Sequence, residues 1–356
     1  MNTYVKLLAG LIILFMIGCN QQSIDQSKIV KKNLDMIYQQ LSLSIESLGD
    51  TDRNPRSAEN GVLRKVSSRD WTSGFYPGCL WYLYEYTGDK TFLKAAIKFT
   101  MNIEMEQFNN GTHDLGFMMY CSFGNGYRLT KEEGFRDVII QSAKTLSTRF
   151  NPNVGCIRSW DHHRDKWQYP VIIDNMMNLE LLFWVAKETG DSSFYNIAVS
   201  HAETTLKNHF REDNSSWHVL DYDTISGEVL HRHTQQGYSN ESAWARGQSW
   251  GLYGFTMVYR ETGNKKFLEQ ARQIADFVLN NKNMPDDMVP YWDYDAPNIP
   301  DEPRDVSAAA ILCSGLYELS SYLGEEGDKY KLAADKILKS LSSKKYQARK
   351  LPDASI

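Results

Sequence analysis

Two aspartates stand where a polar loop gives way to an apolar, helix-like stretch. Asp174 follows three apolar residues in VIIDNMMNLELLFWVAKETGD (171–191), and Asp114 precedes the apolar run of GTHDLGFMMY (111–120). An isolated acid in such a position is ordinarily a helix cap or a partner of the helix dipole. Two acids beside aromatic residues suggest more, because burial and a neighbouring carboxylate both raise the pKa of an acid. We therefore predict a pair in which one aspartic acid stays protonated near neutral pH and acts as a general acid, an arrangement used in sugar chemistry.

Other polar and aromatic residues gather in loops of the same kind. Arg246 and Trp250 are four positions apart in GYSNESAWARGQSWG (237–251), so a helix would place them on one face, a cation beside a flat apolar wall. A carboxylated sugar ring suits this pair. The alternative is that Arg246 pairs with nearby Glu241. His218 is also a candidate because it lies in an aromatic loop, although a lone histidine more often fills a structural hydrogen-bonding role.

A helical hairpin recurs along the chain, and each copy has an apolar helix, a Gly-containing turn and a second helix. The glycine can end the first helix in a left-handed conformation, and the Asp or Asn after it can cap the second helix. The hairpins occupy 80–100, 118–146, 181–206, 253–279 and 316–341.

Repeats of roughly 50 residues, each a helix pair, form an open solenoid or a closed ring. Long aromatic-rich loops between the hairpins favour the ring, because loops on a rigid scaffold carry function. We predict an all-α toroid of about eleven helices beginning at 28–48, one short of six hairpins. Strand-like alternation is confined to VLDYDTISGEVL (219–230).

Composition narrows the classes of partner. The 356 residues are 42% hydrophobic, and their net charge of −5 provides no basic surface for nucleic acid. Apart from Cys19, the chain has Cys79, Cys121, Cys156 and Cys313, and no two of these have metal-ligand spacing. We expect free thiols, no metal site and no nucleic-acid partner.

The N-terminus predicts export. A short apolar run ends at Gly18-Cys19, which is typical of a bacterial lipoprotein signal peptide whose cysteine is lipidated. An ordinary cleaved signal peptide is the alternative. We predict a signal peptide over 1–19, a single catalytic domain over 20–356, and attachment to the bacterial envelope through lipid on Cys19 alone.

Five strings together resemble the unsaturated glucuronyl hydrolases of glycoside hydrolase family 88. They run in order as WTSGFYPG, HDLGF, IIDNMMN, GYSNESAWARGQSWG and VPYWDYDAP…RDVSAAA. The resemblance implies an (α/α)6 barrel. It also implies hydrolysis of lyase-generated, glycosaminoglycan-type oligosaccharides, through hydration of the C4=C5 vinyl ether of a terminal unsaturated uronic acid. Asp174 matches the proton donor and water-activating base, and Asp114 matches its partner carboxylate. No cofactor is implied.

The resemblance extends to further residues of the sugar site. His218, Arg246 and Trp250 match positions that hold the unsaturated ring, and the residues expected to line it are Trp71, His113, Trp160 and Gln236. The family normally continues with a Ser-containing loop and a last helix, whereas this chain ends in the polar tail SSKKYQARKLPDASI (342–356). We therefore expect a C-terminally truncated domain that lacks the twelfth helix, which would close the ring against 28–48. The alternatives are an unsaturated rhamnogalacturonyl hydrolase, a conventional inverting glycosidase and an inactive sugar-binding remnant.

Overall fold

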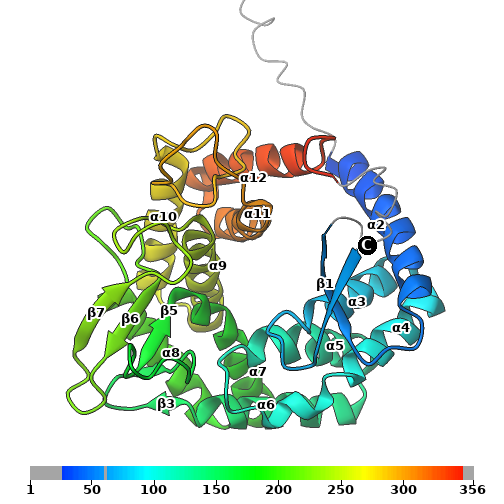
Figure 1. Cartoon of the computed structure of the whole chain (residues 1–356), viewed down its shortest axis with the longest axis horizontal. Helices are drawn as coiled ribbons and strands as arrows, with labels where there is room; N and C mark the ends of the chain where they lie inside the picture. The colour runs from blue at the N-terminus through cyan, green and yellow to red at the C-terminus, as the bar shows by residue number, and fades with distance from the viewer. Residues whose placement is uncertain (1–25, 60–61, 348–356) are drawn as a thin grey trace, which may run out of the picture.

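Helical hairpins follow one another around a ring in the order in which they occur along the chain (Figure 1). The computed structural model describes residues 26–59 and 62–347. The predicted signal peptide and Cys19 lie outside these ranges. Within them, no helix has both the length and the apolar content needed to cross a membrane.

The helices form two concentric layers (Figure 1). The outer layer contains α2 (Gln26–Leu48), α4 (Lys90–Met101), α6 (Glu133–Ser147), α8 (Ser192–Asn208), α10 (Lys265–Asn280) and α12 (Asp328–Leu341). The inner layer contains α3 (Phe75–Thr87), the π-helix η2 (Gly116–Gly124) continued by α5 (Asn125–Thr130), the 3-10 helix η3 (Ile173–Asn178) continued by α7 (Leu179–Thr189), α9 (Ala245–Thr262) and α11 (Val306–Tyr322). Two short 3-10 helices connect them, η1 (Glu104–Phe108) and η4 (Gly324–Gly327).

The turns confirm the hairpin pattern. Gly88, Gly190 and Gly263 end α3, α7 and α9 with φ of 69°, 75° and 66°. The residue after each glycine caps the next helix, and Asp89, for example, accepts a hydrogen bond from the Thr91 N–H at 2.8 Å. The hairpin that begins with η2 departs from the scheme, because Lys131 rather than glycine takes the left-handed conformation, with φ of 63°.

The outer layer closes without a twelfth helix. The Asn33 side chain of α2 donates to Ser342 Oγ, just beyond α12, at 2.6 Å, and Gln26 donates to Asp335 of α12. In the outer layer, contact with 28–48 is therefore made by α12 and the residue that follows it. Among the described residues the inner layer has five helices and the outer layer six, and the inner layer is open between α11 and α3 (Figure 1).

Short strands form in the loops of the ring, and one of the pairings, β5 with β6, joins separate loops. They are β1 (Asn54–Glu59) with β2 (Val62–Val66), β3 (Phe150–Asn151) with β4 (Cys156–Ile157), and the sheet of β5 (Pro170–Ile172), β6 (Val219–Tyr222) and β7 (Val229–His233). The sequence predicted only the strands near 219–230. The strands β3, β4 and β5 escape a pattern search because two or three residues are too few to show alternation, and the sequences of β1 (NPRSAE) and β2 (VLRKV) do not alternate between apolar and polar residues.

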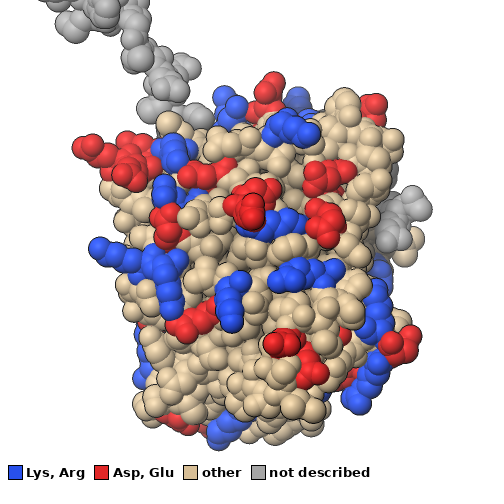
Figure 2. All heavy atoms as spheres, turned by 90° about the vertical axis from the view of Figure 1, so that its left-hand side faces the viewer, with Lys and Arg blue, Asp and Glu red and all other residues tan. Residues whose placement is uncertain are grey.

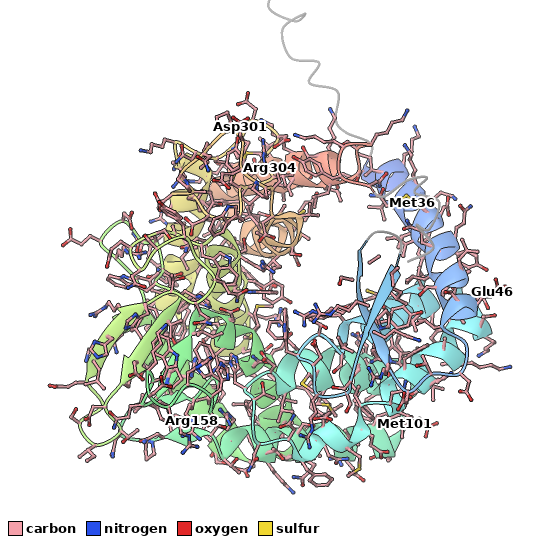
Figure 3. All side chains as sticks on the ribbon, in the orientation of Figure 1. Met36, Glu46, Met101, Arg158, Asp301 and Arg304 are labelled. Carbon is pink, nitrogen blue, oxygen red and sulfur yellow. The ribbon has the colours of Figure 1, made fainter. Side chains whose placement is uncertain are left out.

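The core lies between the two helical layers. Trp81, Phe92, Phe183, Phe255 and Phe267 are among its fully buried side chains. Side chains on outer helices, such as Glu46 and Met101, lie at the circumference of the ring (Figure 3). Figure 2 shows acidic and basic side chains interspersed over one face, in keeping with a surface that lacks a basic stripe there.

The starts of two inner helices make an unusually close approach. A Cβ built on Gly116 of η2 would lie 2.5 Å from Asn178 Cα, and the Asn178 side chain accepts a hydrogen bond from the Phe117 N–H at 3.0 Å. Gly116 is two residues after Asp114, and Asn178 is four residues after Asp174. The absence of a side chain at position 116 therefore allows the two aspartates to approach each other.

We predict that Gly116→Ala destabilises the fold. The added methyl group must separate η2 from η3, and such overpacking costs about 1–3 kcal/mol of unfolding free energy. Denaturant unfolding measures the change. Gly134→Ala in α6 is the matched control, because a Cβ there meets nothing within 4 Å. Equal stability of the two variants would contradict the close approach.

Candidate active site

One cavity collects almost all of the residues that the sequence singled out. It has a volume of about 520 Å3, within the range of small-molecule sites. Eight predicted site residues line it: Trp71, His113, Asp114, Trp160, Asp174, Gln236, Arg246 and Trp250. His218 lies behind Asp174. A larger cavity of about 810 Å3 continues into the ring and shares Phe117 and Trp250 with the first, but neither aspartate lines it.

Asp174 is a buried acid in the first turn of η3. It is only 8% exposed, and its Oδ2 has no hydrogen-bond partner among the described residues. The pKa of Asp174 is raised to about 7, mainly by burial and in part by the charge of Asp114, whereas its own backbone N–H and Arg246 oppose the rise. Near neutral pH the carboxyl group is therefore partly protonated, which a general acid requires.

The short sheet places His218 beside Asp174. Ile172 pairs with Val219, and the Ile173 N–H donates to the His218 carbonyl at 3.1 Å. His218 is therefore opposite Ile173, the residue before Asp174. His218 Nε2 lies 3.7 Å from Asp174 Oδ2. The three residue pairs between β5 and β6 thus bring His218 close to Asp174, although the two are far apart in sequence.

The protonation state of His218 follows from its hydrogen bonds. Its Nδ1 accepts from the N–H groups of Gln235 at 3.1 Å and Gln236 at 3.2 Å, so the proton of the neutral ring is on Nε2. Burial lowers the pKa of His218 to about 3, which keeps the ring neutral. The ring also packs on Trp244, with 4.5 Å between centroids. His218 is therefore an uncharged donor directed at Asp174.

Asp114 is held by its own loop. Thr112 Oγ1 donates to Asp114 Oδ2 at 3.0 Å, and His113 Nε2 lies 3.4 Å from Oδ1. Burial lowers the pKa of His113, so this neighbour is also uncharged at neutral pH. The loop is fixed in place because the His113 N–H donates to the Ser159 carbonyl at 3.3 Å and Thr112 pairs with Trp160.

Aromatic rings form the floor and one wall. Trp71, Phe75 and Phe117 contact one another with centroids 5.5–5.6 Å apart, and Phe117 contacts Trp250 at 5.1 Å. These rings offer flat apolar surface beside the two acids, which suits the face of a sugar ring.

Arg246 has a different partner from the one considered in the sequence. Glu241 lies 3.7 Å from Arg211, whereas Arg246 Nη2 lies 3.1 Å from Asp305 Oδ2. Asp305 also caps α11 by accepting from the Ala308 N–H at 2.8 Å. The Arg246 guanidinium packs over Trp244 at 5.2 Å. The loop before α11 therefore fixes the cation in the cavity wall.

The structure adds residues that the sequence did not single out. Arg56, Arg69, Asp70, Thr112, Phe117 and Trp244 also line the cavity. Trp244 and Phe117 stand inside the quoted motifs and were recognisable there. Arg56 gave no signal, because it reaches the cavity through an irregular hairpin. Among the described residues, no group of three or more His, Cys, Asp or Glu is arranged to hold a metal ion, and the cysteines are free.

Comparison with known proteins places this geometry in a family. The model of "Glycosyl Hydrolase Family 88" matches residues 50–349. The chain belongs to glycoside hydrolase family 88. Family 88 relatives include an "Unsaturated glucuronyl hydrolase" of Formosa agariphila, 46% identical over 96% of this chain and 86% of the relative. An "Unsaturated chondroitin disaccharide hydrolase" of Streptococcus agalactiae is 33% identical over 88% of this chain and 79% of its own length.

Solved structures of family 88 agree with the fold. An unsaturated glucuronyl hydrolase "specific for heparin" superposes with a TM-score of 0.87 at 48% identity, over 90% of this chain and 86% of that one. A mutant enzyme from Streptococcus agalactiae complexed with dGlcA-GalNAc6S gives a TM-score of 0.77 at 29% identity, over 91% and 81%. The predicted (α/α)6 barrel and the glycoside hydrolase class are confirmed.

The raised pKa of Asp174 predicts how stability depends on pH. An acid whose pKa is higher in the folded state than in the unfolded state costs stability as pH rises from about 4 to about 7, and the cost is complete above that range. A change from 3.8 to about 7 corresponds to about 4 kcal/mol. Asp174→Asn should therefore raise the unfolding free energy by a few kcal/mol at about pH 8 and by little at about pH 4.

Urea unfolding at the two pH values measures this difference. Asp191→Asn is the control, because hydrogen bonds from Ser193 lower the pKa of that exposed cap, so its replacement brings no gain at alkaline pH. An Asp174→Asn variant that is no more stable than wild type at alkaline pH would contradict the buried, proton-holding carboxyl.

Proposed function

We propose that the chain hydrolyses lyase-generated, glycosaminoglycan-type oligosaccharides by removing the 4,5-unsaturated uronic acid from their non-reducing end. The main support is Asp174, an acid with a pKa of about 7 in a cavity that also contains a second carboxylate, an arginine and tryptophans. The names of the relatives, glucuronyl and chondroitin disaccharide hydrolases, point to the same class of substrate. A cavity of about 520 Å3 suits a terminal sugar with part of its neighbour.

The reaction follows from one proton donor beside an electron-rich double bond. Asp174 transfers its proton to C4 of the vinyl ether, and the positive charge that develops is shared between C5 and the ring oxygen. Water then adds to C5 and returns a proton to the Asp174 carboxylate. The resulting hemiketal opens, its ring oxygen becomes a hydroxyl on C1, and C1 expels the next sugar as an alcohol. One carboxyl group thus serves as acid and then as base.

The surrounding residues have distinct tasks in this scheme. Arg246, held by Asp305 and Trp244, binds the uronate carboxylate. Asp114 accepts hydrogen bonds from sugar hydroxyls, and its charge helps Asp174 to keep its proton. His218 donates its Nε2 proton toward Asp174 or the incoming water without adding charge. Trp71 and Trp250 present flat surface to the ring, while His113, Trp160 and Gln236 complete the lining.

Loss of the ultraviolet absorbance of the ene-carboxylate tests this proposal. The wild type should remove the absorbance of an unsaturated disaccharide and leave a saturated disaccharide intact. Asp174→Asn should lose about 10²- to 10⁴-fold in kcat, the range of general acid catalysis. Turnover of the saturated sugar would instead indicate a conventional glycosidase, and near-normal rates in Asp174→Asn would assign the proton to another group.

We also propose that the chain is exported and anchored by lipid on Cys19, as the sequence around Gly18-Cys19 suggests. Two-phase detergent partitioning of bacterial membranes should recover the wild type in the detergent phase and a Cys19→Ser variant in the aqueous phase. Equal partitioning of the two proteins would count against the anchor.

A further inference from the structure

The active-site cavity changes in character from its floor to its mouth. At the floor, His113 is 3%, Trp250 7% and Asp174 8% exposed. At the mouth, Arg69 is exposed and the Arg56 side chain is 31% exposed. A terminal unsaturated sugar must reach the floor to meet Asp174, so the sugar bonded to it extends toward the mouth. The two arginines therefore lie on the path of the second sugar.

A β-bulge directs Arg56 toward this path. Pro55 pairs with Lys65 and Ser57 pairs with Arg64, so Arg56 is the extra residue between two consecutive pairs. A bulged residue escapes the alternation of the strand, and bulges are frequent beside active sites for that reason. The hairpin is anchored because the buried Asn54 side chain donates to the carbonyls of Ser73 and Phe99.

Asp70 is fully occupied by other partners. Its Oδ2 accepts a hydrogen bond from Arg56 Nη1 at 2.7 Å. Its Oδ1 accepts hydrogen bonds from the Thr72 N–H at 3.0 Å and from Thr72 Oγ1 at 2.6 Å. The neighbouring Arg69 has no carboxylate within ion-pair distance anywhere in the described ranges, although it lines the same cavity. A guanidinium that is always charged thus stands at the cavity mouth, and none of the described residues provides its counter-ion.

The other charged groups of the cavity do not supply that counter-ion. Arg246 is the third cation of the lining, and Asp305 holds it by an ion pair. Asp114 is bound by Thr112, and Asp174 is buried and partly protonated. On the rim, His162 stacks on Trp160 at 5.2 Å, and burial lowers its pKa, so it is neutral near pH 7.

We propose that Arg69, supported by Arg56, forms a subsite for a sulfate group on the sugar that follows the unsaturated uronate. This inference rests on the proposed function. A guanidinium presents a planar fork of donors that matches an oxyanion bidentately, and the exposed position leaves it open to an incoming ligand. Arg246 takes the carboxylate of the first sugar, and Arg69 takes the anionic group of the second. The substrate class is therefore a sulfated disaccharide end.

Kinetics on matched substrates test the subsite. One unsulfated unsaturated disaccharide is compared with a panel of counterparts, each with a single sulfate at a different position on the second sugar. The selectivity ratio is kcat/KM for the sulfated substrate divided by kcat/KM for the unsulfated one. For at least one sulfate position, Arg69→Gln should lower this ratio at least tenfold, and Arg69→Lys should lower it less because the charge remains.

Two further variants serve as controls. Arg64→Gln removes the same charge from the same hairpin, but Arg64 does not line the cavity, so the ratio should stay at the wild-type value. Arg246→Gln should weaken both substrates alike and leave the ratio unchanged, since both carry the uronate. An equal ratio in Arg69→Gln and Arg64→Gln for every sulfate position overturns the subsite, as does a wild-type preference for the unsulfated disaccharide throughout the panel.

A longer substrate separates sulfate from a second carboxylate. An unsulfated unsaturated tetrasaccharide carries a uronate on its third sugar, and a defect of Arg69→Gln confined to this substrate would assign Arg69 to that carboxylate instead. If the wild type turns over no substrate, the proposed function fails. Calorimetric binding of the intact disaccharides still reports on Arg69 in that case, because the ratio of binding constants then replaces the ratio of kcat/KM.

Discussion

The site depends on the close packing of η2 against η3. Gly116 fits against the backbone of Asn178, where a methyl group would come within 2.5 Å, and the Asn178 side chain accepts from the Phe117 N–H. Each of these helix starts carries one aspartate. Their approach lets the charge of Asp114 act on Asp174, and the aromatic floor built around Phe117 encloses them both. Without this contact the two acids would lie farther apart, and the charge of Asp114 would act less on Asp174.

Burial of Asp174 lowers the stability of the fold at neutral and alkaline pH, but it also keeps the proton that the proposed reaction needs. An ionised carboxylate in a dry cavity is unfavourable, and its unfavourable energy appears as the raised pKa. The surroundings moderate this effect without abolishing it. His218 is kept neutral by its own burial and by two backbone N–H groups that donate to Nδ1. Arg246 forms an ion pair with Asp305, which partly neutralises its charge. A fully charged partner in contact with Asp174 would stabilise the carboxylate and remove the proton that the proposed reaction needs.

Both the helices of the ring and the segments between them supply residues of the site. Inner helices supply Asp174, Arg246 and Trp250, loops supply Trp71, Asp114 and Arg69, and strand β1 supplies Arg56. The outer layer closes between α2 and α12, so the ring is held together although the described inner layer has five helices. The catalytic groups are thus fixed by the part of the ring that is complete, from α3 through α11.

The sequence alone determined the features that depend on local patterns. Helical periodicity and Thr-Gly-Asp turns predicted the hairpins, and spacing placed Arg246 and Trp250 on one helix face lining the cavity, because these properties extend over only a few residues. The tertiary structure decided the partners. The pairing of Arg246 with Asp305 depends on a loop, the tautomer of His218 on the Gln235 and Gln236 N–H groups, and the reach of Arg56 on a bulge. Such contacts join residues distant in sequence, and no local pattern encodes them.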